Sequence, residues 1–189
     1  MSFPYLFDYQ QELYMLPETG ESNSIRLYKC VEFPLKWEYQ KEILSGVRAV
    51  DSMIFEYRGK WWLLTNMATK GNNDLCSQLM AYYSEQPFSD EWIAYKKNPL
   101  VFDGNIGRNG GSLDVESNFP IRCRQKQGFN LYGAALTLAR ITDITPSSFS
   151  EQKIGEILPN FFHNIQGCHH IHTNGKYTVY DYVFTETLK

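Results

Sequence analysis

The sequence lacks long apolar runs, an excess of positive charge and any recognisable metal or cofactor motif. Its longest apolar run is far too short to cross a bilayer, and its start has no signal peptide. We therefore expect a cytoplasmic protein without a membrane partner. The net charge of −3 at pH 7 over 189 residues offers no broad cationic surface to nucleic acid. Neither a CxxC nor an HExxH pattern is present, so we expect no metal and no cofactor.

Cysteine is scarce, and the chain has only Cys30, Cys76, Cys123 and Cys168. These residues fit either buried thiols of a cytosolic protein or two disulfide bridges, and their spacing does not separate the two cases. We favour free thiols because the chain begins without a signal peptide.

Helical patterning is scarce as well, whereas aromatic residues are abundant. No segment carries three turns of apolar residues at helical spacing. Ser150–Leu158 is at most a short helix, and the alternative is that Gln152-Lys153-Ile154 begins the fourth strand of the third repeat. Aromatics make up 15% of the chain, with 13 Tyr and 12 Phe. This composition suits a β-rich interior and also suits sugar recognition, and for any single ring we expect packing.

A repeat organises the chain. Tyr5–Glu18 aligns without a gap with Met53–Asn66, at an offset of 48 residues. A third copy, His170–Asp181, carries the turn Asn174-Gly175-Lys176 where the second has Arg58-Gly59-Lys60. A period near fifty residues is typical of a propeller or an array, in which equivalent strand positions face a common axis.

Within each repeat, the pattern predicts four short strands, which is the content of one propeller blade. We therefore predict an all-β protein, a β-propeller of about four visible four-stranded blades within a single domain spanning residues 1–189. The repeats cover roughly residues 3–48, 49–104, 105–160 and 161–189. The fourth ends after its second or third strand, so the blades either close alone or are completed by a partner.

Several stretches in chain order resemble a known family. They include Phe3-Pro4-Tyr5, Glu32–Trp37, Gly59–Trp62, Arg108–Gly111 and Gly167–His170. They are similar to the five-bladed propeller domain at the N-terminus of glucosamine inositolphosphorylceramide transferases. That domain is in turn similar to furanosidase propellers of the arabinanase and invertase type.

The resemblance implies a central funnel that often holds sugars. It also implies a further blade before Phe3, with a leading Asp-Pro, which these residues do not include. In the furanosidases that blade supplies a catalytic base, so the resemblance favours binding over hydrolysis. A homo-oligomer joined through edge strands would be one way to complete the ring.

Polar residues at the start of the innermost strands should converge on the axis. The candidates at this position are Asp51, Arg108 with Asn109, and His169 with His170. A further candidate, Glu18, lies at the end of the second strand of its repeat, and Asn66 occupies the equivalent position in the next repeat. Two carboxylates on facing blades could act as general acid and base in glycoside cleavage. Asp51 could equally form a turn or cap a backbone amide.

Arginines suggest an anionic ligand. Arg108 lies in the glycine-rich segment Gly107–Gly111, where the backbone can come close to another group, although a solvated loop is the alternative. Arg122 and Arg124 alternate along an expected strand and share one face, with Gln125 beside them. Together with Arg108, they would favour a sugar phosphate or a nucleotide sugar over a neutral sugar.

Histidines cluster near the end of the chain, as His163, His169, His170 and His172 beside Cys168. Zinc is not favoured, because on a strand His170 and His172 share a face while His169 points away. We expect His169 or His170 to line the channel as a hydrogen-bonding group or a general acid or base.

Three functions fit these features. The favoured one is a carbohydrate-related module that binds a sugar, a sugar phosphate or a nucleotide sugar without hydrolysis. The second is a glycosidase-like or sugar-transferring enzyme that uses Glu18, Asp51 and His170. The third is a structural module that completes its fold by assembling with a partner. The residues expected at the ligand are Glu18, Asp51, Arg108, Asn109, Arg122, Gln125, His169 and His170.

Overall fold

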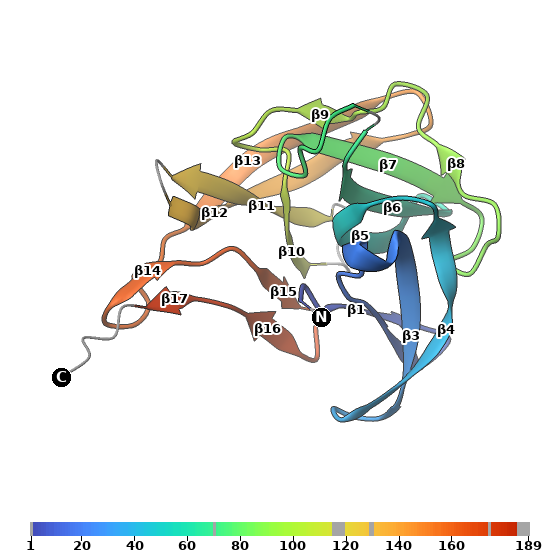
Figure 1. Cartoon of the computed structure of the whole chain (residues 1–189), viewed down its shortest axis with the longest axis horizontal. Helices are drawn as coiled ribbons and strands as arrows, with labels where there is room; N and C mark the ends of the chain where they lie inside the picture. Colours follow the sequence, from blue (N-terminus) through green and yellow to red (C-terminus); the bar gives the residue numbers. More distant parts are fainter. Residues whose placement is uncertain (1, 70, 115–119, 129–130, 174, 185–189) are drawn as a thin grey trace.

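The computed structural model describes residues 2–69, 71–114, 120–128, 131–173 and 175–184. Its strands fall into four groups that follow one another around the molecule in chain order (Figure 1). Part of one predicted turn, Asn174, lies outside the described residues. The prediction of an all-β protein is confirmed, since the regular elements are strands apart from a short 3-10 helix, η1 (Gly20–Ser22).

Three of the four groups are antiparallel sheets, two with four strands and one with five, which we call blades I to III. Blade I contains β1 (Tyr5–Tyr9), β2 (Glu12–Leu16), β3 (Ser24–Glu32) and β4 (Lys36–Ser45). Blade II contains β5 (Ala49–Tyr57), β6 (Lys60–Met67), β7 (Gln78–Ser84) and β8 (Ile93–Ala94), and β9 (Val101–Phe102) also pairs with β7. Blade III contains β10 (Asn109–Asp114), β11 (Ile121–Gly128), β12 (Leu131–Ile144) and β13 (Phe149–Ile157).

The fourth group, blade IV, consists of two short strand pairs. Its strands are β14 (Ile165–Gly167), β15 (Ile171–Thr173), β16 (Thr178–Tyr180) and β17 (Val183–Phe184). β15 pairs with β16, and β14 pairs with β17. The hairpin β15–β16 contacts the inner strands β10 and β1, while β14 contacts β12 and lies with β17 farther from the centre (Figure 1).

The repeat in the sequence corresponds to the same hairpin in blades I and II. Both turn residues of each hairpin have positive φ, 50° and 67° at Gln10 and Gln11, and 53° and 73° at Arg58 and Gly59. Two successive positive φ angles are typical of a type I′ turn, whose twist matches that of the flanking strands. The aligned residues therefore occupy equivalent places in the two sheets.

The innermost strands β1, β5, β10 and β15 lie next to one another around a ring. Between β15 and β1, the ring is closed by side chains as well as backbone. The Nε2 atom of His172 lies 2.6 Å from the carbonyl oxygen of Leu6, and the rings of His172 and Tyr5 have centroids 4.1 Å apart. Blades I and IV, which are far apart in sequence, are therefore joined at the centre.

Most buried aromatic residues belong to blades I and II and form one apolar cluster with residues of β12. Phe7 stacks on Tyr14 and tilts against Trp61, and Trp62 is almost fully enclosed. A smaller apolar cluster lies between blades III and IV around Leu136. These rings serve the core, in agreement with the role expected for aromatic residues in general.

The segment Ser150–Leu158 corrects one prediction. Of the two alternatives for it, the short helix is wrong and the strand at Gln152-Lys153-Ile154 is confirmed, since Phe149–Ile157 forms β13 and pairs along β12. Pairing to β12 satisfies backbone groups that an isolated short helix would expose to water. Hairpin pairing with the preceding strand therefore outweighs the weak helical preference of the segment.

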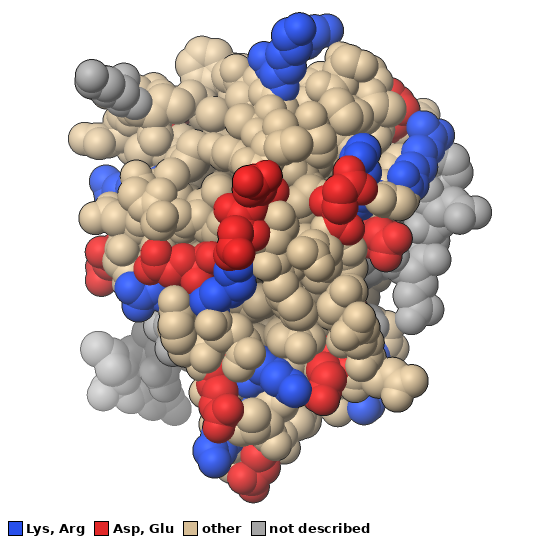
Figure 2. Space-filling model, turned by 90° about the vertical axis from the view of Figure 1, so that its right-hand side faces the viewer, with Lys and Arg blue, Asp and Glu red and all other residues tan. Residues whose placement is uncertain are grey.

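Charges are mixed on the face shown in Figure 2, which is the right-hand side of Figure 1. Acidic and basic side chains lie beside one another there, and this face shows no broad basic area. Ion pairs of blades I and II include Lys29 with Glu12 and Lys60 with Glu85. In the part of the chain that is described, no helix is long and apolar enough to cross a membrane. All four cysteines are free thiols.

Candidate functional site

A pocket of about 290 Å³ with several polar side chains in its lining opens where blades I, II and IV meet. The chain start, with Phe3 and Pro4, forms one wall and Val179 another. The remaining lining residues carry polar side chains: Ser2, Glu18, Asp51, His169, His170 and Asp181. Four of the predicted residues, Glu18, Asp51, His169 and His170, are therefore brought together, and we call this the central pocket.

Asp51 lies at the back of the central pocket on an irregular stretch of β5. Its φ is 51°, and the pairing of β5 with β6 shifts register between Val50 and Met53. Such a β-bulge can turn one side chain out of the regular alternation. The carboxylate accepts hydrogen bonds from Arg108 Nε at 2.6 Å and from Gln125 Nε2 at 3.0 Å.

The protonation of Asp51 reflects its burial. Loss of solvent raises the pKa of its carboxyl to about 6, while Arg108 opposes this shift and Glu18 adds to it. Near neutral pH, the carboxylate is ionised and paired with the Arg108 guanidinium. It can then accept a hydrogen bond from a ligand hydroxyl.

Asn109 holds blades II and III together behind Asp51. Its Nδ2 donates to the carbonyl oxygens of Asp51 and Leu64, at 2.9 and 3.2 Å. Its backbone N–H donates to Oδ1 of Asn66 at 2.8 Å. Asn109 and Asn66 are both fully buried, so they position the pocket and do not line it. Asn66 therefore differs from Glu18, although the two residues align in the repeat.

The expected cluster of three arginines at a ligand does not form. Arg122 is enclosed and donates to Glu151 through Nε at 3.0 Å and Nη2 at 2.7 Å. Arg124 donates to the same carboxylate at 3.1 Å. The two guanidinium groups outweigh the effect of burial and hold the pKa of Glu151 below its usual range. Glu151 and Asp51 thus neutralise the arginines that the sequence suggested for an anionic ligand.

Gln125, another residue expected at the ligand, supports Asp51 from inside. It is fully buried, and its Nε2 also donates to the carbonyl oxygen of Asn109 at 2.8 Å. Like Asn109, it fixes the position of the carboxylate without lining the pocket.

The glycines around Arg108 and Asn109 allow a close approach, as expected, but the approaching group is the protein itself. A Cβ on Gly110 would lie 3.0 Å from the carbonyl oxygen of His169. A Cβ on Gly111, whose φ is 101°, would clash with the carbonyl oxygen of Ile171. These glycines therefore let β10 pack directly against the segment that carries the pocket histidines.

His169 is oriented by Asp181. Nδ1 of His169 lies 2.6 Å from Oδ2 of Asp181, and Oδ1 accepts the backbone N–H groups of His169 and His170 at 2.9 and 2.8 Å. Burial opposes ionisation of Asp181, but these hydrogen bonds outweigh it and lower the pKa of the carboxyl. The carboxylate therefore fixes both histidines at the pocket.

His170 is the least satisfied polar group of the site. It is 3% exposed, its ring meets Phe3 edge-on at 4.4 Å, and neither ring nitrogen has a hydrogen-bond partner among the described residues. Burial lowers the pKa of His170 to about 3, and the neighbouring His172 contributes to this shift. The ring is therefore neutral at physiological pH and offers one donor and one acceptor.

A metal centre does not emerge from the histidines. His172 is committed to Leu6 of blade I, and His163 is exposed. In the described ranges, no group of three His, Cys, Asp or Glu residues is arranged to hold a metal ion.

Glu18 faces the pocket from the end of β2. It is half-buried, and none of the described side chains forms a hydrogen bond or an ion pair with its carboxylate. It also borders a second polar pocket of about 530 Å³ that runs over η1 toward Arg26 and Tyr28. Glu18 is therefore available to a ligand.

Two residues of the arrangement were missed in the sequence. Asp181 orients both histidines, and Glu151 neutralises Arg122 and Arg124. Asp181 could have been found by extending the repeat, since it lies at the end of the second strand of its copy, near the place of Glu18. No local pattern singles out Glu151, whose partners are close only in the folded protein.

The family model for the N-terminal domain of glucosamine inositolphosphorylceramide transferase 1 matches residues 1–167. Glucosamine inositolphosphorylceramide transferase 1 of Arabidopsis thaliana is 34% identical over 157 residues, which is 82% of this chain. The protein of the same name from Oryza sativa subsp. japonica is 32% identical over 153 residues, or 80% of the chain. The match covers 20% of each relative, so the chain spans about a fifth of their length.

Solved structures with the same fold are glycoside hydrolases. The exo-beta-1,3-galactanase of Phanerochaete chrysosporium with beta-1,3-galactotriose has a TM-score of 0.63 at 8% identity, covering 98% of this chain and 44% of that one. The GH43_1 enzyme of Xanthomonas citri complexed with xylotriose has a TM-score of 0.58 at 9% identity, covering 97% and 73%. At such low identity these likenesses show the fold alone, and the predicted β-propeller is confirmed.

Proposed function

The chain belongs to the family of the glucosamine inositolphosphorylceramide transferase 1 N-terminal domain, and from that membership we propose that it is a sugar-binding propeller module. The ligand is a neutral or amino sugar held in the central pocket, which binds it without hydrolysing it. The family is carbohydrate-related by name, and the fold neighbours were solved with galactotriose and xylotriose.

The observation that carries this proposal is the unsatisfied imidazole of His170 in the wall of a polar pocket. A buried donor and acceptor without partners are costly unless a ligand satisfies them. A sugar hydroxyl can both donate and accept, so it can meet either nitrogen of a neutral imidazole. Polar groups that converge on a preformed pocket are the usual arrangement of a small-molecule site.

Charge favours a neutral or amino sugar over a phosphorylated one. Glu18, Asp51 and Asp181 contribute carboxylates to the pocket, and Arg108 is paired with Asp51. Repulsion from these carboxylates would weaken binding of a phosphate group. An amino sugar would instead gain a charge-assisted hydrogen bond.

The protonation of the pocket supports binding over catalysis. His170, with a pKa of about 3, is almost never an imidazolium at neutral pH and so cannot serve as a general acid. Asp51 is held by Arg108 and Gln125, which restrict its movement toward a reacting atom. Hydrolysis of an aryl galactoside or aryl xyloside to the free sugar and the phenol by the wild-type protein, lost in Asp51→Asn, would establish the enzyme alternative and refute the non-hydrolytic module.

Replacement of Glu18 by glutamine should weaken sugar binding. Isothermal titration calorimetry with galactose, xylose, glucosamine and their phosphates would identify the ligand. Loss of a hydrogen bond to a charged group, about 1.5–3 kcal/mol, corresponds to a roughly ten- to hundredfold lower affinity. The control is Glu56→Gln, which alters an exposed glutamate on β5 outside the pocket and should leave the affinity unchanged. Equal affinities in both variants, or no saturable heat with any sugar, would contradict the proposal.

His170→Phe should stabilise the fold while it abolishes binding. Phenylalanine keeps the ring that packs on Phe3 and removes two unpaired buried nitrogens, so we expect a gain of roughly 1 kcal/mol in unfolding free energy. The matched variant is His172→Phe, which should lower stability because it leaves the carbonyl oxygen of Leu6 without its partner. Urea denaturation and calorimetry measure the two effects.

A His170→Phe protein that binds sugar like the wild type would remove His170 from the site. A loss of stability in this variant as large as that in His172→Phe would show that its imidazole has a structural partner.

A further inference from the structure

An apolar pocket adjoins the central pocket at His170 and Asp181. It has a volume of about 290 Å³ and is lined almost entirely by apolar and aromatic side chains. Its walls come from β12, β13 and blade IV: Leu136, Ile157, Phe161, Phe162, Ile171 and Tyr180. His170 and Asp181 line both pockets, so the two are adjacent. We call it the apolar pocket.

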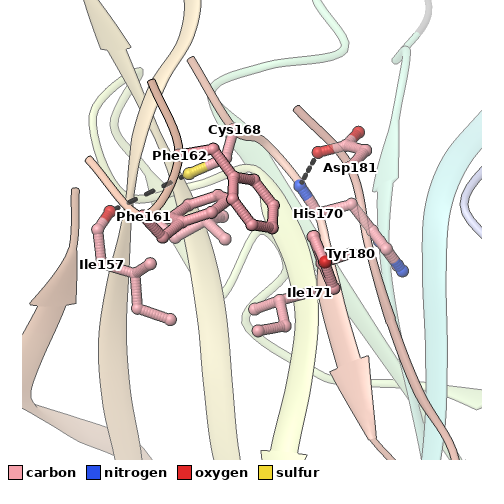
Figure 3. Close-up of a pocket in the computed structure, with 9 residues that line it drawn as sticks. Ile157, Phe161, Phe162, Cys168, His170, Ile171, Tyr180 and Asp181 are labelled. Carbon is pink, nitrogen blue, oxygen red and sulfur yellow. Dashed lines mark hydrogen bonds between the residues drawn. The ribbon is translucent and has the colours of Figure 1, made fainter. Parts of the chain in front are cut away.

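Figure 3 shows how these side chains are arranged. Phe161 and Phe162 lie on one side and Tyr180 and Ile171 on the other, while the His170 side chain extends away from the phenylalanine rings. The backbone N–H of His170 donates to Asp181, which fixes the boundary between the two pockets. The imidazole itself packs on Phe3 at the central pocket.

The rim of the apolar pocket is a continuous group of exposed rings. Phe161 contacts Phe162 at 5.5 Å and Tyr180 at 5.9 Å between ring centroids, and Tyr182 contacts Phe162 at 5.8 Å and Phe184 at 6.1 Å. Phe162 is 53% exposed and Phe184 is 56% exposed. An apolar group of this extent on a surface usually marks a binding site.

Two observations together decide what the apolar pocket would hold. It offers almost no hydrogen-bonding groups, so it suits a hydrocarbon or aryl group and not a sugar ring. It meets the polar site at His170, a fully buried side chain with two unpartnered nitrogens. A ligand with a sugar on one side of His170 and an apolar group on the other would satisfy both.

We propose that the apolar pocket is a second subsite, which takes the alkyl or aryl group of a glycoside whose sugar lies in the central pocket. This inference rests on the proposed sugar-binding function and specifies its ligand class as an amphipathic glycoside. Burying the apolar group supplies affinity that the hydroxyl contacts of a small sugar lack.

A chain-length series tests the subsite. Methyl, butyl and hexyl β-galactosides and β-xylosides are titrated into the protein by calorimetry, below the concentration at which they form micelles. Each buried methylene should raise the affinity about fourfold, the equivalent of about 0.8 kcal/mol, until the pocket is filled. Equal affinity for the methyl and hexyl glycosides would overturn the proposal while leaving the sugar site standing.

Variants at the rim separate the two subsites. Phe162→Ala and Tyr180→Ala should lose most of the chain-length dependence but keep the affinity for the methyl glycoside. Glu18→Gln should weaken all members of the series equally. The control, Phe102→Ala, removes a still more exposed phenylalanine on β9, outside the pocket, and should change nothing. Thermal melting confirms that each variant is folded.

Two further outcomes are decisive. If hexyl glycosides bind no better than hexanol, the apolar pocket is occupied but no sugar is held, and the proposed function fails. If the wild type self-associates in gel filtration and Phe162→Ala is monomeric, the aromatic rim is an interface between copies of this chain. That result would overturn the subsite.

Discussion

Glu151→Gln should lower the unfolding free energy by about 3–5 kcal/mol, because it leaves two buried guanidinium groups without a counter-charge. Arg122 has no exposed side-chain surface, Arg124 has 6%, and both donate to this one carboxylate. Arg122 also donates to the carbonyl oxygens of Gly107 and Ile106, so it is fixed in place and cannot turn to water. Urea denaturation at neutral pH measures the loss.

The matched control is Glu156→Gln on the same strand. Glu156 pairs with Lys126 at the surface, so its loss should cost roughly 0–1 kcal/mol. Because the arginines lower the pKa of Glu151, its stabilisation is present above the ordinary pKa of glutamate and is lost as the pH falls. Wild type should therefore lose more stability on acidification than Glu151→Gln does. If Glu151→Gln were as stable as Glu156→Gln, the buried Arg122 would not need the carboxylate of Glu151 as its counter-charge, and the prediction would be wrong.

Gly111→Ala should open the contact between blades III and IV. The new Cβ would clash with the carbonyl oxygen of Ile171, and the backbone there has φ of 101°. Conformational strain of about 1–2 kcal/mol adds to overpacking of about 1–3 kcal/mol, so we expect a loss of about 2–5 kcal/mol. Chemical denaturation gives this value, and calorimetry should show weakened sugar binding, because Ile171 directly follows the pocket histidines.

Gly59→Ala separates the two contributions. Gly59 also has positive φ, 73°, but its Cβ would meet nothing within 4 Å. Gly59→Ala should therefore lower the unfolding free energy only by the conformational strain, about 1–2 kcal/mol, and leave sugar binding unchanged. Equal losses in the two variants would mean that β10 and β15 can separate at no cost and that the close approach is not needed.

The sequence predicted the architecture through the repeat. The hairpins at Gln10-Gln11 and Arg58-Gly59 have the same turn conformation, as the aligned segments suggested. Strand periodicity is local information, because alternate side chains face opposite sides of a sheet. The expectation of at most a short helix was wrong at Ser150–Leu158, where pairing with the preceding strand β12 decides the conformation.

The candidate site was predicted in part. The repeat placed Glu18, Asp51, His169 and His170 near one axis, and the structure brings these four to the central pocket. The repeat could not tell which polar residues face inward and which find partners. Arg122 was therefore assigned to a ligand although Glu151 neutralises it.

Strand period and repeat length are enough to predict the class of fold and the neighbourhood of the site, because both are read along the chain. The chemistry of each polar group depends on the folded arrangement. The neutral state of His170, the pairing of Arg108 with Asp51 and the adjacency of the apolar pocket depend on burial and on contacts between blades. Burial and charge pairing depend on distances in space, which residues far apart in the chain acquire only when the ring of inner strands closes.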